Sequence, residues 1–442
     1  MMNYLTELGF QRKFTCFLLV LISAVFPLSA QQNLTLQEAL AQARNNQLYR
    51  ARLEQIEVLK AGQQQAKKRP NPRLETEFET GVIAGEPGDH LISVVFLNTW
   101  ERGGARGLRQ QIAQAEVQQA TLDAEDYMRV LTSEIRLAYL ELLQLQRQVS
   151  LLEIHSERIN KVLQLDQVRV REGEIPSLNP EYLSTELAGL EVRKMGFENQ
   201  LWLARYRLNV LMGAPAEREL LAVEEATQES GLPALEQVLR FALKNRADLR
   251  KMRGTLQQAD LQFSMEEAEA KRDWEWGVGY HRIGDSLRSD DFVPPGIIES
   301  AGSSTNLLEL RLNIPLPLWD NNSGNLAAAL ATKKVREREL AHAEALVRSE
   351  VLSAHRAYQL HQKGVQLYRD TLVPKLQETL RRLETAYQLT GESVTEWLDI
   401  QRTFLGAALQ GQEADFQVRA SVVKLELAVG GSLEEVTQAS SP

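Results

Sequence analysis

The sequence predicts a mainly helical protein with a small β part, in which one structural plan occurs twice. Three observations support this prediction. Hydrophobic residues recur at alternating steps of four and three over two very long segments, four short segments alternate between apolar and polar residues, and matching residues recur at a spacing near 218. The first pattern is typical of coiled-coil helices and the second of strands.

The composition limits the class of protein. The 442 residues are 43% hydrophobic, 6% aromatic and 25% charged, with a net charge of −9 and one cysteine. The negative charge disfavours nucleic-acid binding, and a single cysteine excludes a disulfide scaffold or a multi-cysteine metal site. A mean hydropathy of −0.30 excludes a polytopic helical membrane protein, although strands that span a membrane leave no hydropathy peak.

The amino terminus has the layout of a secretory signal peptide. Arg12 and Lys13 precede an apolar run over residues 14–26, and small residues follow up to Ala30. The run is too short to span a bilayer, so we expect export and cleavage after residue 30. Cys16 lies only three residues after Lys13, where a lipid-bearing cysteine is not expected.

Matching residues divide the rest of the chain into two repeats. The pairs are Trp100-Glu101 with Trp319-Asp320, Ser133-Glu134-Ile135 with Ser349-Glu350-Val351, and Gly173-Glu174 with Gly391-Glu392. Because the three pairs keep their order at almost one spacing, we predict a duplication, with a first repeat over 31–230 and a second over 231–442. The period is too long for a solenoid, whose units span about 20–50 residues.

Each repeat is predicted to contain a long helical hairpin, over 104–212 in the first and 323–429 in the second. The outgoing helices cover 106–171 and 324–390, about 67 residues each, or about 100 Å. Each leads into a polar turn with a glycine, and helices over 180–212 and 394–429 return. Pro374 is the one proline in the second outgoing segment, so a kink is expected there.

Two strands precede each hairpin, over 73–82 and 90–98 in the first repeat and over 273–283 and 306–314 in the second. Their alternation places apolar and aromatic residues on one face and charged residues on the other. This pattern fits strands with lipid on one side and water on the other, and it also fits a soluble antiparallel sheet over a core.

If these strands span a membrane, the barrel must be shared between chains. Four strands cannot close a barrel, and an open sheet edge is not tolerated in hydrocarbon. Three copies would supply twelve strands in a cyclic homotrimer. Their six helical hairpins would then form an α-barrel in continuation of the β-barrel.

The plan resembles the TolC-like outer-membrane efflux proteins over nearly the whole mature chain. Residues 34–40, LTLQEAL, resemble the family's capped first helix, and residues 314–325, IPLPLWDNNSGN, resemble the strand-to-helix crossing of its heavy-metal (cobalt–zinc–cadmium, CzcC-type) branch. The resemblance implies a trimeric conduit in the outer membrane of a Gram-negative bacterium, with its helices in the periplasm. It also implies a periplasmic adaptor, an inner-membrane proton-driven pump of the RND type, and heavy-metal cations as cargo.

The hairpin ends are the candidate gate and docking site. Glu396 and Asp399 match the place where the family carries paired acids, and three-fold symmetry would turn each into a cation-attracting ring; they are equally well explained as helix-start acids favoured by the helix dipole. At the other turn, salt bridges could hold a closed state through Arg169, Arg171, Glu172 and Glu174. The turn residues Gly173, Gly391 and Glu392 are expected to contact the adaptor.

The charged face of the strands is the candidate lumen. Its acids outnumber Arg73 and Arg311 and predict a weakly cation-favouring pore; they are Glu75, Glu77, Glu79, Asp273, Glu275 and Glu309. Trp274, Trp276 and Tyr280 should lie against lipid.

No enzyme, cofactor or metal site is expected. Residues 103–107 lack the ending of a P-loop, and no histidine pair has the spacing of a helical metal site. Two alternatives remain: a TolC-like duct for drug efflux or type I protein secretion, and a soluble periplasmic coiled-coil adaptor or scaffold.

Overall fold

The structure, a computed structural model, describes residues 32–80, 90–224, 231–284, 304–390 and 394–439. It is mainly helical with a small β part, as predicted. The predicted signal peptide lies outside the described residues. Within those ranges, no helix has both the length and the apolar character needed to cross a bilayer.

Long helices occupy the two segments where hairpins were predicted. The first segment holds α4 (Ala105–Glu172) and α5 (Leu178–Met212). The second holds α8 (Ser323–Leu367), α9 (Val373–Thr390) and α10 (Val394–Val429). These bounds lie close to those predicted from the periodicity.

The sequence periodicity missed most of the shorter elements. They are β1 (Gln32–Leu34), α2 (Leu36–Gln42), η1 (Ala43–Asn45), α3 (Gln47–Ala66), β4 (Leu220–Ala222), α6 (Leu235–Asn245), α7 (Ala247–Glu269) and α11 (Leu433–Ala439). The capped first helix was expected, and α2 does begin with a capping box. The Glu38 amide donates to Thr35 Oγ1 at 3.2 Å, and the Thr35 amide donates to Glu38 Oε2 at 2.9 Å, which satisfies two amides at the helix start.

The chain forms two compact units that each combine separate stretches of sequence. The first comprises residues 1–47, 130–231 and 354–427, and the second comprises residues 48–129, 232–353 and 428–442. Each unit therefore draws on both of the predicted repeats. The division at residue 231 remains a prediction.

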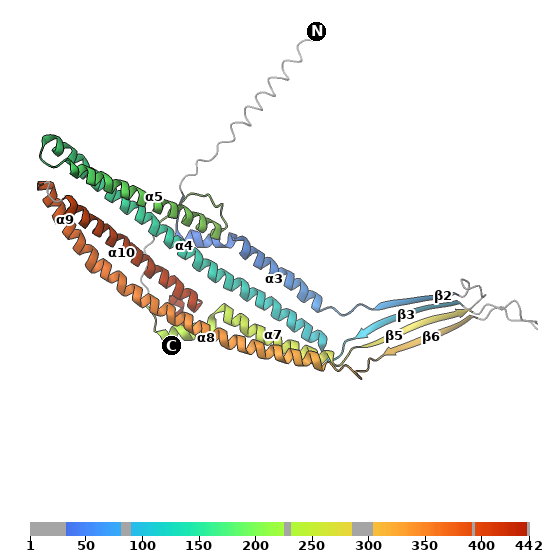
Figure 1. Cartoon of the computed structure of the whole chain (residues 1–442). Coiled ribbons are helices and arrows are strands. Elements are labelled where there is room, and N and C mark those ends of the chain that lie inside the picture. Colours follow the sequence, from blue (N-terminus) through green and yellow to red (C-terminus); the bar gives the residue numbers. More distant parts are fainter. Residues whose placement is uncertain (1–31, 81–89, 225–230, 285–303, 391–393, 440–442) are drawn as a thin grey trace, which may run out of the picture. The chain divides into compact units, whose positions relative to one another are not determined.

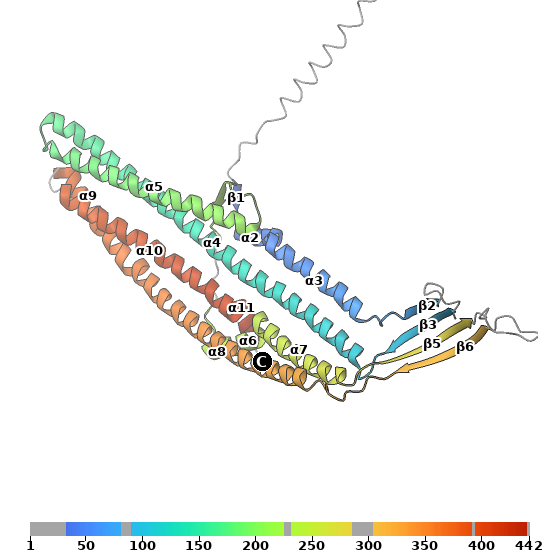
Figure 2. The same ribbon diagram turned by 45° about the vertical axis from the view of Figure 1, so that its right-hand side comes forward.

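In the first unit, helices run antiparallel in pairs (Figures 1 and 2). Lys194 of α5 lies 3.5 Å from Glu153 of α4, and the Tyr368 hydroxyl lies 3.1 Å from Gln410 Oε1 of α10. The seam is apolar at the predicted steps of four and three. Its members Leu131, Ile135, Leu142, Leu152 and Ile159 are at most 2% exposed.

The second outgoing helix is interrupted just before Pro374. A π-helical turn, η3 (Tyr368–Leu372), separates α8 from α9. Proline has no amide hydrogen to donate to the preceding turn, and a π-turn is one way a helix accommodates such a loss. A π-helical turn therefore lies where a kink was predicted.

In the second unit, β2 (Arg73–Thr80), β3 (His90–Trp100), β5 (Trp274–Gly284) and β6 (Ser304–Asn313) form one antiparallel sheet in that order (Figure 1). These bounds lie close to the four predicted strands. The register aligns Glu75, Val95, Gly279 and Glu309 across the sheet. A Cβ on Gly279 would lie 2.9 Å from Val95 Cγ2 and 2.9 Å from Glu309 Oε2, so glycine permits this close approach.

Prolines and an asparagine shape the crossing from β6 to α8. Pro315 and Pro317 come directly after β6, and α8 begins at Ser323. Asn322 caps the helix, because its carbonyl accepts the Leu326 amide at 3.0 Å. Its side chain also donates to the Glu266 carbonyl of α7 at 2.9 Å. Its φ of 63° lies in the left-handed region that asparagine tolerates.

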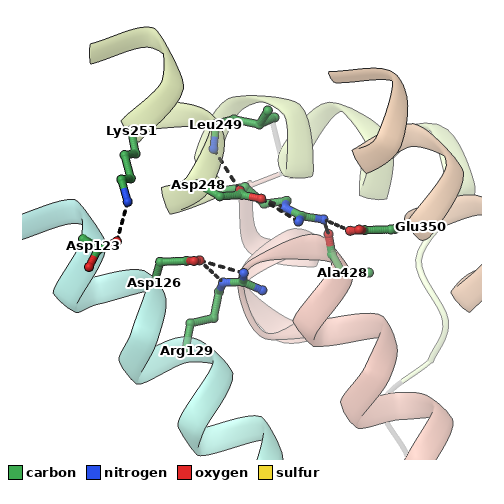
Figure 3. Close-up of polar contacts among 9 residues, drawn as sticks. Asp123, Asp126, Arg129, Asp248, Leu249, Lys251, Glu350 and Ala428 are labelled. Carbon is green, nitrogen blue, oxygen red and sulfur yellow. Dashed lines mark hydrogen bonds and ion pairs between the residues drawn. The ribbon is translucent and has the colours of Figure 1, made fainter. Parts of the chain in front are cut away.

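Arg246, between α6 and α7, joins three segments of the second unit. It bonds Asp248 twice, through Nε at 3.0 Å and Nη2 at 2.7 Å. Its Nη1 donates to Glu350 of α8 at 2.6 Å and to the Ala428 carbonyl at 2.9 Å (Figure 3). The residue is only 5% exposed.

Candidate functional site

The turn after α4 is shaped by Gly173. Its φ is +78°, a left-handed conformation that favours glycine. The Gly173 amide donates to the Val170 carbonyl at 3.1 Å and the Glu174 amide to the Arg169 carbonyl at 2.9 Å, which is the Schellman arrangement at a helix end. The equivalent predicted turn residues Gly391 and Glu392 lie outside the described residues.

The two candidate gate acids share the exposed face at the start of α10. Glu396 and Asp399 are exposed, whereas Trp397 and Leu398 between them are buried. Arg402, one turn further on, lies 3.5 Å from Asp399 and 2.7 Å from Glu186 of α5. The acids are thus one helical turn apart and face water in a single chain, with Asp399 next to a cation.

The four charged residues at the other turn differ in their contacts. Arg169 donates to the Gln388 carbonyl of α9 at 2.6 Å and lies 3.7 Å from Glu174. Arg171 donates to the carbonyl of Gln167 on its own helix at 3.1 Å. Glu172 is exposed. Arg169 therefore links the two hairpins within one chain, and salt bridges that would hold a closed state remain a prediction.

A buried polar contact beside this turn was not predicted. The Tyr387 hydroxyl of α9 donates to Asp166 of α4, and the Asn179 side chain donates to that hydroxyl at 3.5 Å. Asp166 is fully buried, and Tyr387 is 3% exposed. Burial raises the pKa of the Asp166 carboxyl against the opposing effects of Tyr387 and Arg169. Burial and the Asp166 charge raise the pKa of Tyr387 as well.

The periodicity contained a signal for this contact. The seam of α4 steps from Ile159 to Leu163 and then, by three, to Asp166. A carboxylate at an apolar seam position requires a polar partner. The sequence did not indicate which residue supplies it, because α4 and α9 are more than 200 positions apart.

An apolar cluster supports the contact. Tyr387 stacks on Trp397, with ring centroids 5.7 Å apart and an interplanar angle of 14°. The two rings pack among buried aliphatic side chains of α4, α5 and α10, namely Leu152, Ile159, Val162, Leu183, Leu190, Val394, Leu398, Leu405 and Leu409. The hairpin ends of one chain are therefore packed together around a few polar groups.

Most of the candidate lumen acids lie on one face of the sheet. The register places Glu75, Glu77 and Glu79 of β2 on the same face as Glu275 of β5 and Glu309 of β6. Asp273 instead precedes β5 and accepts the Arg102 amide at 2.8 Å. The opposite face carries the apolar side chains, including Trp274, Trp276 and Tyr280.

Several of these acids are paired within the chain. Arg311 lies 3.0 Å from Glu75 and 2.9 Å from Glu309, and His281 Nε2 lies 2.6 Å from Glu309 Oε2. Arg73 contacts Glu275. The charge of this face is therefore more balanced than a count of acids alone suggests. Among the described residues, no group of three or more His, Cys, Asp or Glu side chains is arranged to hold a metal ion.

Comparisons with known proteins agree with the fold. Residues 238–431 match the family described as outer membrane efflux protein. The cobalt-zinc-cadmium resistance protein CzcC of Cupriavidus metallidurans is 23% identical over 390 residues, which cover 87% of this chain and 87% of CzcC.

Solved structures show the same fold along the chain. A structure of CusC, from work on its folding and transmembrane channel formation, matches with a TM-score of 0.72 at 16% identity and covers 90% of this chain and 92% of its own. The outer membrane protein VceC of Vibrio cholerae matches with a TM-score of 0.69 at 15% identity and covers 90% and 96%. These two solved structures show the fold of this chain. The chain is therefore similar to the outer membrane efflux proteins: residues 238–431 match that family, CzcC resembles it over most of its length, and CusC and VceC share its fold.

Proposed function

We propose that three copies of this chain form the outer-membrane exit duct of a tripartite efflux system. The observation that carries this proposal is the four-stranded sheet with its two contrasting faces. On the apolar face, Phe78, Leu308 and Leu310 are 72–79% exposed in the single chain. Such a surface is unfavourable in water and is suited to lipid.

The open sheet supports the trimer. Among the described strands, β2 and β6 each pair on one side only, and an unpaired edge is not tolerated in hydrocarbon. Because the four strands alternate in direction, β6 of one copy pairs antiparallel with β2 of the next. Three copies then close a barrel of twelve strands with the charged face inward.

The proposed partners come from the family resemblance, and the proposed cargo is supported by one relative. The relation to a cobalt-zinc-cadmium resistance protein supports heavy-metal cations as cargo, with a periplasmic adaptor and an inner-membrane proton-driven pump as partners. The chain itself acts as a passive conduit without a cofactor or catalytic role. Its amino-terminal signal directs export, and the turn at Gly173, with its counterpart at 391–392, contacts the adaptor.

Fractionation of cells that produce the mature protein tests this proposal. We expect a heat-modifiable trimer in outer-membrane extracts. In a separate growth assay, we expect a strain that lacks the protein to become sensitive to cobalt, zinc or cadmium. Recovery in the soluble periplasm would contradict the duct and favour the adaptor or scaffold. Sensitivity to drugs but not to metals, or loss of a secreted protein, would retain the duct and change its cargo.

The gate acids give a second measurable consequence. In planar bilayers, the double substitution Glu396→Ala and Asp399→Ala is expected to lower the ratio of cation to anion permeability by about tenfold, because rings of carboxylates concentrate cations. A matched control removes Glu191 and Glu198, two exposed acids of α5. An unchanged ratio in the gate variant, or an equal fall in the control, would mean that these acids have no gating role and only stabilise the start of the helix.

A further inference from the structure

A cavity of about 360 Å³ lies where β3 leads into α4. Its wall includes Arg69, Trp100, Glu101, Arg106 and Trp276. Gly104 and Gly107 contribute backbone without side chains to the same wall. The volume is at the lower end of the range for small-molecule sites, so a compact polar group would fill it.

The cavity wall carries unbalanced positive charge. Within the described part of the chain, neither Arg69 nor Arg106 enters an ion pair, and Glu101 is the one acid of this wall. Glu101 is only 11% exposed and is paired with Arg109. Its charge is therefore compensated, and the two arginines remain available to an anion.

Aromatic side chains connect the cavity to the apolar face of the sheet. Trp100 meets Trp274 edge to face at 6.2 Å, and Phe96 lies 6.4 Å from Trp276. The Arg102 guanidinium lies 4.3 Å above the Trp274 ring. Tryptophans of this kind are enriched at the boundary between hydrocarbon and lipid headgroups, and the cavity is lined by two of these tryptophans, Trp100 and Trp276.

Basic residues gather at the same end of the sheet. Lys67 and Lys68 stand beside Arg69 ahead of β2, and Lys271 and Arg272 stand ahead of β5. Clusters of lysine and arginine next to membrane-spanning segments are typical of sites for anionic lipid. Apart from Arg69, these residues do not line the cavity, so they attract the membrane surface in general, whereas Arg69 and Arg106 can hold one group.

We propose that this cavity binds the phosphate of an anionic membrane phospholipid through Arg69 and Arg106. The acyl chains of that lipid extend along the apolar face beside Trp100 and Trp276. This assignment rests on the proposed function, in which that face contacts the membrane. A lipid is favoured over free phosphate because the cavity has tryptophan walls that continue into an apolar surface, which an inorganic ion would not use.

Native mass spectrometry of the full mature protein in detergent tests the site, with phosphatidylglycerol as the probe. The double substitution Arg69→Gln and Arg106→Gln is expected to weaken phosphatidylglycerol binding on the order of twentyfold, about fivefold per arginine. The matched control, Lys67→Gln with Lys68→Gln, removes the same charge at the same level outside the cavity. It is expected to weaken binding by less than about twofold, because exposed charges act only through the screened surface potential.

Three results would overturn the proposal. Equal weakening in both pairs of variants would mean that a general basic belt attracts the lipid. No weakening in either pair would mean that these basic residues do not hold the lipid. Displacement of the lipid by inorganic phosphate at equal concentration would identify a free anion as the ligand. Recovery of the heat-modifiable trimer from each variant is measured separately. If the natural chain forms no outer-membrane trimer, the proposed function is wrong. If it forms the trimer but shows no preference for the lipid, only this inference is wrong.

Discussion

Replacing Arg246 with alanine is expected to lower the free energy of unfolding of the protein by about 3 kcal/mol. The guanidinium is buried and bonds two carboxylates and one carbonyl. Breaking a buried ion pair from one side costs about 3–5 kcal/mol. We expect the lower end because the side chains of Asp248 and Glu350 keep 36% and 52% of their exposure.

Thermal melting followed by circular dichroism measures this effect. Arg250→Ala is the matched control, because Arg250 lies near the start of α7, four residues after Arg246, is 51% exposed and lies 3.5 Å from Glu125. A surface pair of this kind contributes less than about 1 kcal/mol. If the melting temperature falls equally in both variants, Arg246 contributes no more to stability than a surface arginine.

The same substitution should change the titration of Asp248. Burial acts to raise the pKa of this carboxyl, but hydrogen bonds and charge from Arg246 outweigh burial and lower it. A lowered pKa contributes stability that is present at neutral pH and is lost as the pH falls through it. Without Arg246, the Leu249 amide and the Arg129 charge remain to oppose burial, so most but not all of this contribution should disappear.

The long elements could be predicted because their information is local. A seam with steps of four and three runs through α4, and alternation marks β2 and β6, so the bounds followed from periodicity alone. The helices α6 and α7, of 11 and 23 residues, are much shorter than α4. The Arg246 contacts that hold their junction come from residues 104 and 182 positions away. No local pattern encodes such contacts.

The candidate site divides in the same way. The exposed faces of Glu396 and Asp399 follow from their spacing on a helix that buries Trp397. The pairing of Glu75 with Arg311 depends on the sheet, in which β3 and β5 separate β2 from β6. On that face, Gly277 and Gly279 of β5 have no side chain to stand between the two residues. Counting acids treated Glu75 and Glu309 as free charges, whereas the structure places Arg311 beside both. The net charge of the face can be read from the sequence, but the ion pairs that neutralise its acids can be identified only from the fold.

A second large effect is expected at His155, in the seam between α4 and α10. The residue is 3% exposed, and its ring lies 5.5 Å from that of Phe404. Burial, together with the charge of Arg158, lowers the pKa of His155 to about 4, although Gln401 favours the protonated ring. The histidine is therefore neutral in the folded protein at pH 7.

Because the pKa of His155 is lower in the folded chain than the ordinary value of 6.5, the unfolded chain binds the proton more readily. The stability that the neutral His155 contributes is fully present above about pH 6.5 and is lost as the pH falls toward 4, by a total on the order of 3 kcal/mol.

Melting temperatures measured across this range should fall steeply in the natural protein and less in His155→Leu, which keeps the seam apolar. The control His361→Leu removes a half-buried histidine of α8 and should retain the full acid dependence. If His155→Leu kept the same slope, buried carboxylates elsewhere would have to account for it, and Asp166 cannot, since its raised pKa makes acid stabilising rather than destabilising.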